Sequence, residues 1–502
     1  SLPGKIELSI FPWVAVQFGP ASLGNPPGFG SQPFASVQRA SLRVRLLPLL
    51  HKQLQVGRVE VDGLDLHLLK NAQGRANWEM SQSGAKPTET SGPGAVSLQG
   101  IAGVVVRNSR VSYQDMVADH LNIDVGRVAQ GVAVPIKWSL DLATAPGARP
   151  IPISGGASFE YGGNTAKLSG LDARLDDSTV RGDAALTNLT TGALRFDLSI
   201  DHFDLDRYRT PQVASAKSSA ATATQLPLDA LKGLDVDGKV SIGSATVSGV
   251  KLSQVSVGLA DHGNVAHFAP IAAQLYGGRY TGDVTIDDRG AEPALHLDQQ
   301  MQGIRIEPLL QDFAHQRRIS GQGNVATNLT ARGRTTDQLI RTLDGHVTAN
   351  LANGAINGID LWSAINGAIA VAQRKGLPSG GVGGSTKFDA FKVSADLTNG
   401  VASTHDLDIA SGDLHVTGQG TTNLNTGAVD YRLNATVLKG AAGAAGAGTL
   451  ASIPLLVSGT MTSPSVRPDV QGLAKSLAQR ELEKHKGELK QKLQNALKGL
   501  FH

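Results

Sequence analysis

Apolar and polar side chains alternate along most of this 502-residue chain, and this pattern limits what it can fold into. A period of two places every second side chain on the same side of a β-strand, so each strand has one apolar face. Glycine-containing turns such as Tyr276-Gly-Gly and Thr398-Asn-Gly separate the alternating segments. The sequence therefore predicts a mainly β protein built from many short strands.

An apolar sheet face has to be covered by helices, by a second sheet, or by something other than protein. Helices are expected at only four places, near Val37 to Leu50, Thr335 to Leu343, Ile359 to Lys375, and from Pro468 onward. We therefore predict an extended, curved antiparallel β-sheet that forms an elongated groove, with a few short helices and a C-terminal amphipathic helix. Lipid tails are one cover for such a face, and an ordinary protein core is the alternative.

Low-complexity stretches divide the chain. Residues 210–226, which include TPQVASAKSSAATAT, are small and polar and are typical of a linker. We expect an N-terminal β-groove region at 1–209, a C-terminal β-groove region at 227–467 and the amphipathic helix at 468–502. The uncharged run from Gly440 to Val457 is mostly Gly and Ala, so it predicts a loop leading into a strand at Ile453 to Val457 rather than a membrane span.

The apolar positions of the clearest alternating segments are the candidates for the groove lining. They are Leu194, Phe196, Leu198, Ile200, Val255, Val257, Leu259, Leu295, Leu297, Val325, Leu329, Leu414, Val416, Val429, Tyr431 and Leu433.

The C-terminal segment combines apolar residues at helical spacing with flanking lysines. Candidates for contact with a membrane or partner are Leu489, Leu493, Leu497, Leu500, Lys490 and Lys492. Such a basic amphipathic helix either docks on the edge of the sheet or lies on a membrane surface, and both interpretations stay open here.

Composition and motifs exclude several function classes. Lys and Arg total 46 against 43 for Asp and Glu, which gives a net charge of +3 and little electrostatic support for nucleic-acid binding. The absence of cysteine removes thiolate catalysis, disulfides and Cys-based zinc sites. No catalytic motif is present, and His262 and His267 lack the further ligands of a metal site, so we expect no enzyme, no cofactor and no metal.

Four segments resemble the AsmA family in its own order along the chain. They are the opening at Phe11 to Leu50 with Val56 to Trp78, the unit GKVSIGSATVSGVKLSQVSVGLADHGNVAHFAPIAAQLYGGRYTGDVTID, the region from Ile319 to Leu361, and the closing IPLLVSGTMTSPSVRPD. In that family the opening follows a membrane-spanning helix, so the resemblance implies an anchor before Ser1.

The resemblance also implies a location and a role. It implies a periplasmic β-groove anchored in the inner membrane of a Gram-negative bacterium and related to bridge-like lipid-transfer proteins. Phospholipids would then be the partners, and the function would be to bind or conduct them along the groove for outer-membrane lipid homeostasis. A structural or chaperone-like factor that acts on outer-membrane proteins during their assembly is the alternative.

Overall fold

The computed structural model describes residues 6–9, 13–45, 53–71, 74–78, 97–128, 131–208, 228, 233–372, 384–412, 414–437, 452–472, 474–475, 478, 485–487 and 489–490. The protein is mainly β with few short helices, as the alternation predicts. It divides into two units, Ser1–Val213 with Leu234–Ser244, and Ala214–Gly233 with Ala245–His502. We call them unit 1 and unit 2, and the boundary between them falls inside one strand, β15 (Asp235–Val247).

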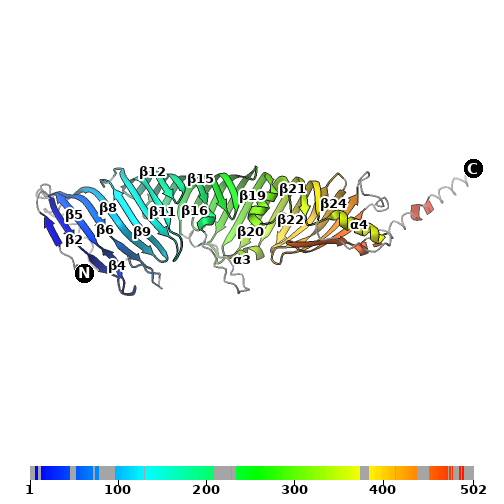
Figure 1. Ribbon diagram of the computed structural model, residues 1–502, viewed down its shortest axis with the longest axis horizontal. Helices are drawn as coiled ribbons and strands as arrows, with labels where there is room; N and C mark the ends of the chain where they lie inside the picture. Colours follow the sequence, from blue (N-terminus) through cyan, green and yellow to red (C-terminus); the bar gives the residue numbers. More distant parts are fainter. Residues whose placement is uncertain are drawn as a thin grey trace, which may run out of the picture. The chain divides into compact units, whose positions relative to one another are not determined.

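Unit 1 is built on a curved, open sheet (Figure 1). Its strands are β1 (Ile6–Ser9), β2 (Trp13–Phe18), β3 (Ala21–Gly24), β4 (Pro33–Val37), β5 (Arg39–Arg45), β6 (Gln53–Asp62), β7 (Asp65–Leu68), β8 (Ser97–Tyr113), β9 (Met116–Val125), β10 (Val134–Ala143), β11 (Ile151–Gly162), β12 (Thr165–Leu175), β13 (Ser178–Asn188) and β14 (Ala193–Asp204), followed by the short helix η1 (Leu205–Tyr208). From β8 to β14 each strand pairs antiparallel with the next.

The pairing in unit 1 departs from the predicted antiparallel pattern at one place. Strand β8 runs parallel to β6 and β7, which lie end to end along it. The sheet is therefore mixed, although every other recorded strand pair in the described residues is antiparallel.

The helix predicted near Val37 to Leu50 is wrong, because the described part of this segment is strand. Strand β5 lies between β2 and β6 and pairs antiparallel with both. Its arginines at 39, 43 and 45 alternate with Ala40, Leu42 and Val44, so the segment has the period of a strand. Residues 46–50 lie outside the described residues.

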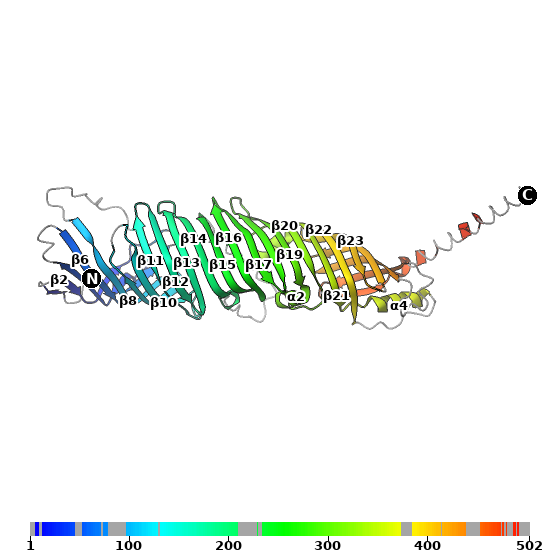
Figure 2. The ribbon, with the colours of Figure 1, turned by 90° about the horizontal axis from the view of Figure 1, so that it is seen from above.

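Unit 2 continues the same hairpin pattern (Figure 2). Its elements are β16 (Val250–His262), β17 (Val265–Leu275), β18 (Gly278–Asp287), β19 (Ala294–Arg305), α2 (Ile306–Ala314), β20 (Gln322–Arg332), α3 (Thr336–Arg341), β21 (Asp344–Asn357), α4 (Leu361–Ala372), β22 (Ser385–Thr398), β23 (Val401–Ala410), β24 (Leu414–Asn423), β25 (Ala428–Val437), β26 (Ile453–Thr460) and β27 (Ser463–Pro468). Strands β16 to β27 pair antiparallel in sequence order.

The helices of unit 2 match the prediction in part. Helix α3 begins with a capping box, in which the Thr335 hydroxyl accepts from the Gln338 N–H and the Gln338 side chain accepts from the Thr335 N–H. Helices α3 and α4 occupy the two internal segments where helices were predicted, and β26 covers the predicted strand at Ile453 to Val457. Helix α2 was not predicted.

Several sequence predictions lie outside the described residues. These concern all of the linker at 210–226, the Gly- and Ala-rich segment at 440–450, and most of the helix from Pro468 onward. Within the part of the chain that the structure does describe, no helix is both long enough and apolar enough to cross a bilayer.

Candidate functional site

An apolar row crosses ten neighbouring strands of unit 1. In the strand register each member lies directly opposite the next, and we call the set the unit 1 row. Its members are Phe18, Ala40, Val61, Val106, Ile123, Trp138, Gly155, Ala173, Val180 and Ile200.

Every member of the unit 1 row is half-buried rather than buried. Nine strand-to-strand steps of about 4.8 Å make the row about 43 Å long. Most of the alternate positions carry polar side chains, with the buried Val105 as an exception, and cross-strand ion pairs such as Arg181 with Asp172 stabilise that other face. The sheet thus presents a long apolar track on one face and charge on the other.

Unit 2 contains a second track, which we call the unit 2 row. It consists of Leu259, Phe268, Val284, Leu297, Leu329 and Gly345, each opposite the next in the register. All six are half-buried, and the next partner, Leu397, is buried. The neighbouring positions on the other face are polar and include Asp283, Asp298, Asn328, His346 and Asp396.

The same apolar face of unit 2 also carries a closely packed strip, nearer the opposite ends of the strands. We call it the core strip. Its fully or nearly fully buried members include Leu275, Ile304, Leu351, Ile409, Val416, Ala435 and Ile453. The apolar face is therefore divided lengthwise, with one part packed like a protein interior and the other part left half-exposed.

Two helices account for this division. Helix α4 packs against β22, β26 and β27, and its Leu361, Ile365 and Ala368 are 0 to 1% exposed. Helix α2 packs against β16, and its Leu309 and Leu310 lie against the core strip. Neither the unit 1 row nor the unit 2 row belongs to this cluster of buried residues.

The structure separates the sixteen predicted groove residues into two groups. Half-buried are Leu194, Phe196, Leu198, Ile200, Val257, Leu259, Leu295, Leu297, Val325, Leu329, Val429 and Tyr431. Buried are Val255, Leu414, Val416 and Leu433. The last three belong to the core strip, and Val325 and Tyr431 pack against it, so packing explains these five without a ligand.

Of the predicted membrane-contact residues, only Leu489 and Lys490 lie within the described residues. Both are helical and exposed, and the Leu489 side chain is 64% exposed. Leu493, Leu497, Leu500 and Lys492 lie outside the described residues.

Sequence reasoning missed most of the unit 1 row. Ile123 and Trp138 were not among the predicted groove residues, although Ile136, Trp138 and Leu140 alternate with polar residues as clearly as the chosen segments do. The signal was therefore present in the sequence. What the sequence could not give is the register that aligns these positions across strands.

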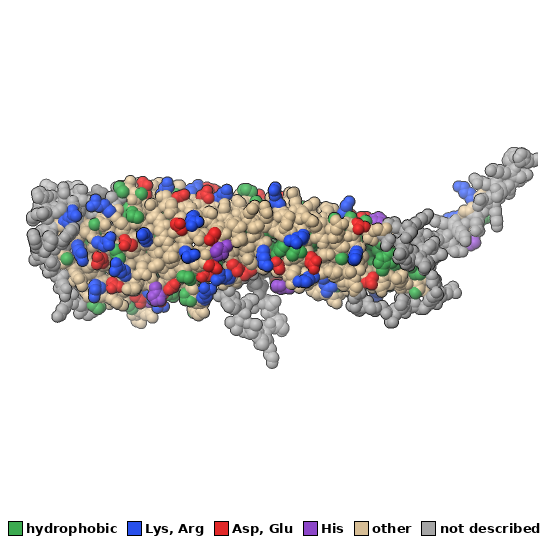
Figure 3. Space-filling model, turned by 45° about the horizontal axis from the view of Figure 1, so that its top comes forward, with side chains coloured by type: hydrophobic (Ala, Val, Ile, Leu, Met, Phe, Trp, Pro, Cys, Tyr) green, Lys and Arg blue, Asp and Glu red, His purple; other side chains and the backbone are tan. Residues whose placement is uncertain are grey.

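Charged side chains are spread over the face of the protein that Figure 3 shows. Many are paired between neighbouring strands, as in His267 with Asp283 at 2.9 Å and His346 with Asp396 at 2.8 Å. These pairs hold their histidines in cross-strand contacts, and within the described residues no group of three or more potential ligands could hold a metal ion.

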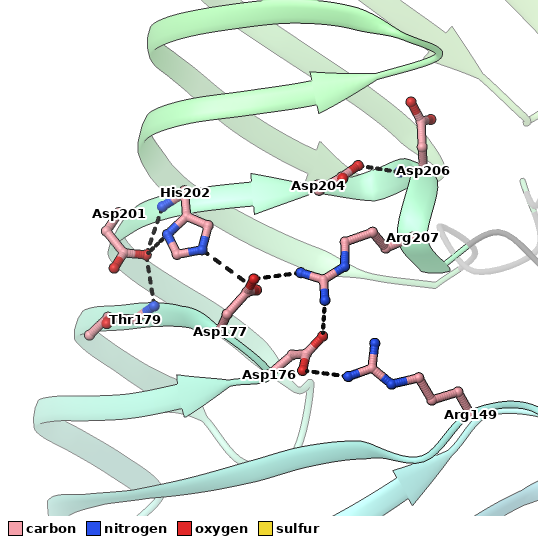
Figure 4. Close-up of polar contacts among 9 residues, drawn as sticks. All are labelled: Arg149, Asp176, Asp177, Thr179, Asp201, His202, Asp204, Asp206 and Arg207. Carbon is pink, nitrogen blue, oxygen red and sulfur yellow. Dashed lines mark hydrogen bonds and ion pairs between the residues drawn. The ribbon is translucent and has the colours of Figure 1, made fainter.

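An ion-pair network holds helix η1 at the end of β14 (Figure 4). The Arg207 guanidinium lies 2.5 Å from Asp177 Oδ2 and 3.1 Å from Asp176 Oδ2, and Arg149 donates to Asp176 Oδ1 at 3.2 Å. Arg207 holds the pKa of the Asp177 carboxyl below its ordinary value. Each charge has an opposite partner, so the network is best explained as a structural clamp that holds helix η1 at the end of β14.

Beside the clamp, Asp201 caps two backbone groups. Its Oδ1 accepts from the N–H groups of Thr179 and His202, both at 2.7 Å. The two hydrogen bonds lower the pKa of Asp201 to about 2, and the one from Thr179 makes the larger contribution.

Comparison with known proteins gives a consistent result across most of the chain. The model of the AsmA family matches residues 1–138 and 157–407. Protein AsmA of Escherichia coli (strain K12) is 19% identical, and the alignment covers 88% of this chain and 81% of that protein. No solved structure matches.

Proposed function

The chain belongs to the AsmA family, and from this membership and the two apolar rows we propose that it binds phospholipids by laying their acyl chains along the half-buried strips of its sheet. Members of this family are bacterial envelope proteins associated with outer-membrane assembly and lipid homeostasis. We further propose that the protein acts in the periplasm, anchored to the inner membrane, and handles phospholipid for the outer membrane. It needs no catalytic residue for this role.

The unit 1 row is the observation that carries the proposal. Ten apolar positions lie opposite one another on successive strands, and all ten are half-buried. A protein core would bury them, as helices α2 and α4 bury the core strip of unit 2. A face that is apolar, continuous and covered by none of the described helices is the surface that an acyl chain would contact favourably.

The energetic reason for such a track follows from the cost of exposing lipid. Withdrawing an acyl chain into water costs about 0.8 kcal/mol per CH₂, or about 11 kcal/mol for a chain of about fourteen carbons. A continuous apolar strip offsets most of this cost at every position along it. A chain could then shift from strand to strand without crossing water, which amounts to passive conduction.

Native mass spectrometry of gently purified protein tests the proposal. We expect bound phospholipid, released on collisional activation and identified by its mass. A stoichiometric protein client without lipid would instead support the alternative role in outer-membrane protein assembly. Protein that carries neither, even after incubation with phospholipid vesicles, would contradict the lipid-binding proposal.

A further inference from the structure

One carboxyl group lies on the apolar face of unit 2. Asp261, the penultimate residue of β16, is 0% exposed. Both of its carboxylate oxygens are buried, and neither has a hydrogen-bond partner among the residues that the structure describes. Buried polar groups in folded proteins are almost always hydrogen-bonded, so this exception needs a physical explanation.

The strand register places Asp261 directly beside the unit 2 row. It lies opposite Ala266 on β17. From Ala266 a second line of register partners, parallel to the unit 2 row, continues through Ile286 and Leu295 to Ala331. These apolar residues occupy the same face as Leu259 and its partners, two residues closer to the hairpin at the end of β16. Asp261 thus lies at one end of the half-buried strip, where a bound chain would approach the rim of the sheet.

Burial has a direct electrostatic consequence for this carboxyl. Removal from water disfavours the charged form, and it raises the pKa of Asp261 above its ordinary value. The neighbouring His262 opposes this shift only in part, because it follows Asp261 on the strand and so points to the opposite face. Burial therefore shifts the protonation equilibrium of this carboxyl toward its neutral form.

Among the described residues, the recorded register gives the ionised form of Asp261 no charged partner. The register partner is an alanine that is 2% exposed, and the other members of this row are also apolar. A metal ion would need further ligands, and the described residues contain no such cluster. A bound molecule is one source of a cation for this carboxylate.

We propose that Asp261 receives the ammonium group of an amine-bearing phospholipid head, while an acyl chain of the same lipid lies along the unit 2 row. The inference rests on the proposed function and adds the head-group class to it. A molecule with an alkyl chain and a cationic head matches both features of this end of the strip. An anionic head without an amine, such as phosphatidylglycerol, matches only the apolar part.

Binding of the ammonium group is coupled to loss of a proton. A protonated Asp261 carboxyl would release its proton to solvent on binding, and the resulting carboxylate would pair with the lipid ammonium, so charge is balanced. Because burial disfavours the charged form, ionisation also favours exposure of the Asp261 carboxylate to solvent. Affinity for the amine-bearing lipid should therefore increase as pH rises through the raised pKa of this group.

The test uses the full chain and vesicles of equimolar phosphatidylethanolamine and phosphatidylglycerol. After incubation the protein is separated and its bound lipids are quantified by mass spectrometry. We expect phosphatidylethanolamine to be enriched about tenfold, the ratio that one charge-assisted hydrogen bond supplies. Asp261→Asn should remove the enrichment and leave the total amount of bound lipid unchanged. Asp430→Asn, which neutralises an exposed carboxylate on the polar face, is the matched control and should keep the phosphatidylethanolamine enrichment.

The outcomes separate this inference from the proposed function. Wild-type protein that binds both lipids equally would overturn the head-group site while lipid binding itself stands. Protein that binds neither lipid would overturn both. A second readout is the pH profile of wild-type binding, which should rise with pH for phosphatidylethanolamine and stay flat for phosphatidylglycerol. Identical profiles for the two lipids would contradict the inference, whatever the stability of the variant.

Discussion

Leu297 of β19 lies directly opposite Leu329 of β20, and both side chains are half-buried. Their neighbours in the chain, Asp298 and Asn328, also lie opposite each other but on the polar face. Such pairing repeats from strand to strand, and it converts a local alternation into a continuous apolar strip. The proposed lipid binding depends on this pairing, because an isolated apolar side chain on a surface needs no ligand.

The division of the apolar face predicts different responses to the same substitution. Leu198→Glu and Val257→Glu, at half-buried positions, should lower the free energy of unfolding by only about 1 kcal/mol, because the new carboxylate can remain hydrated. Val416→Glu, at a position that is 0% exposed in the core strip, should cost about 3 to 5 kcal/mol or prevent folding. Urea denaturation monitored by circular dichroism measures all three. Equal and severe losses would show that the half-buried positions are also closed core.

The burial of Asp261 predicts a stability that depends on pH. A carboxyl whose pKa is raised by folding contributes stability that is fully present when the pH is below its pKa in the unfolded protein, near 3.8. This contribution is lost as the pH rises through its pKa in the folded protein. Asp261→Asn should therefore be more stable than wild type at neutral pH, and the difference should disappear near pH 4. Thermal melts of both proteins across this range provide the measurement. A variant that is less stable at neutral pH would show that the carboxylate has a stabilising partner.

Asp201 predicts the opposite dependence. Its pKa is lowered to about 2 by the Thr179 and His202 N–H groups, so its contribution is present above about pH 3.8 and is lost as pH falls toward 2. Asp201→Asn should be less stable than wild type at neutral pH and nearly equal to it at pH 2. The control is Asp197→Asn, an exposed carboxylate on the same strand. A stability difference that persists unchanged at pH 2 would count against the capping role.

The exposed leucine near the C-terminus predicts weak membrane binding. Leu489→Glu should reduce binding to anionic vesicles, because the leucine is 64% exposed and lies beside Lys490. Vesicle co-sedimentation measures the change, with uncharged vesicles as the control. Unchanged sedimentation would favour the interpretation in which this helix has no membrane contact.

Local sequence patterns predicted much of the fold. The alternation in Leu194 to Ile200 and in Leu295 to Leu297 correctly indicated strands with one apolar face, and the polarity of Asp298 and Asn328 follows from the same pattern. The helix predicted over β5 is wrong because the alternation from Arg39 to Arg45 has the period of a strand. Helix α2 was missed even though Ile306, Leu309, Leu310 and Phe313 recur at helical spacing.

The division into half-buried strip and core strip could not be predicted in this way. Val416 and Leu297 have the same local pattern, yet one is fully buried and the other is half-buried. Val416 belongs to the buried cluster that also contains Leu361 and Ile365 of helix α4, whereas Leu297 lies outside that cluster. The sequence does indicate that Asp261 is unusual, because Asp261 continues the alternation of Val257 and Leu259. A carboxyl at an apolar position of a strand is typical of a functional or strained site.

The most direct test of the account is the amount of phospholipid bound when the strip is interrupted. The double variant Leu297→Glu with Leu329→Glu places two carboxylates on the unit 2 row, and Asn328→Glu places one on the polar face of the same strand as a control. Native mass spectrometry should show phospholipid on the wild type and on the control, and a loss of about tenfold or more on the folded double variant. Equal lipid on all three proteins would contradict the assignment of the half-buried strip as the lipid-binding surface.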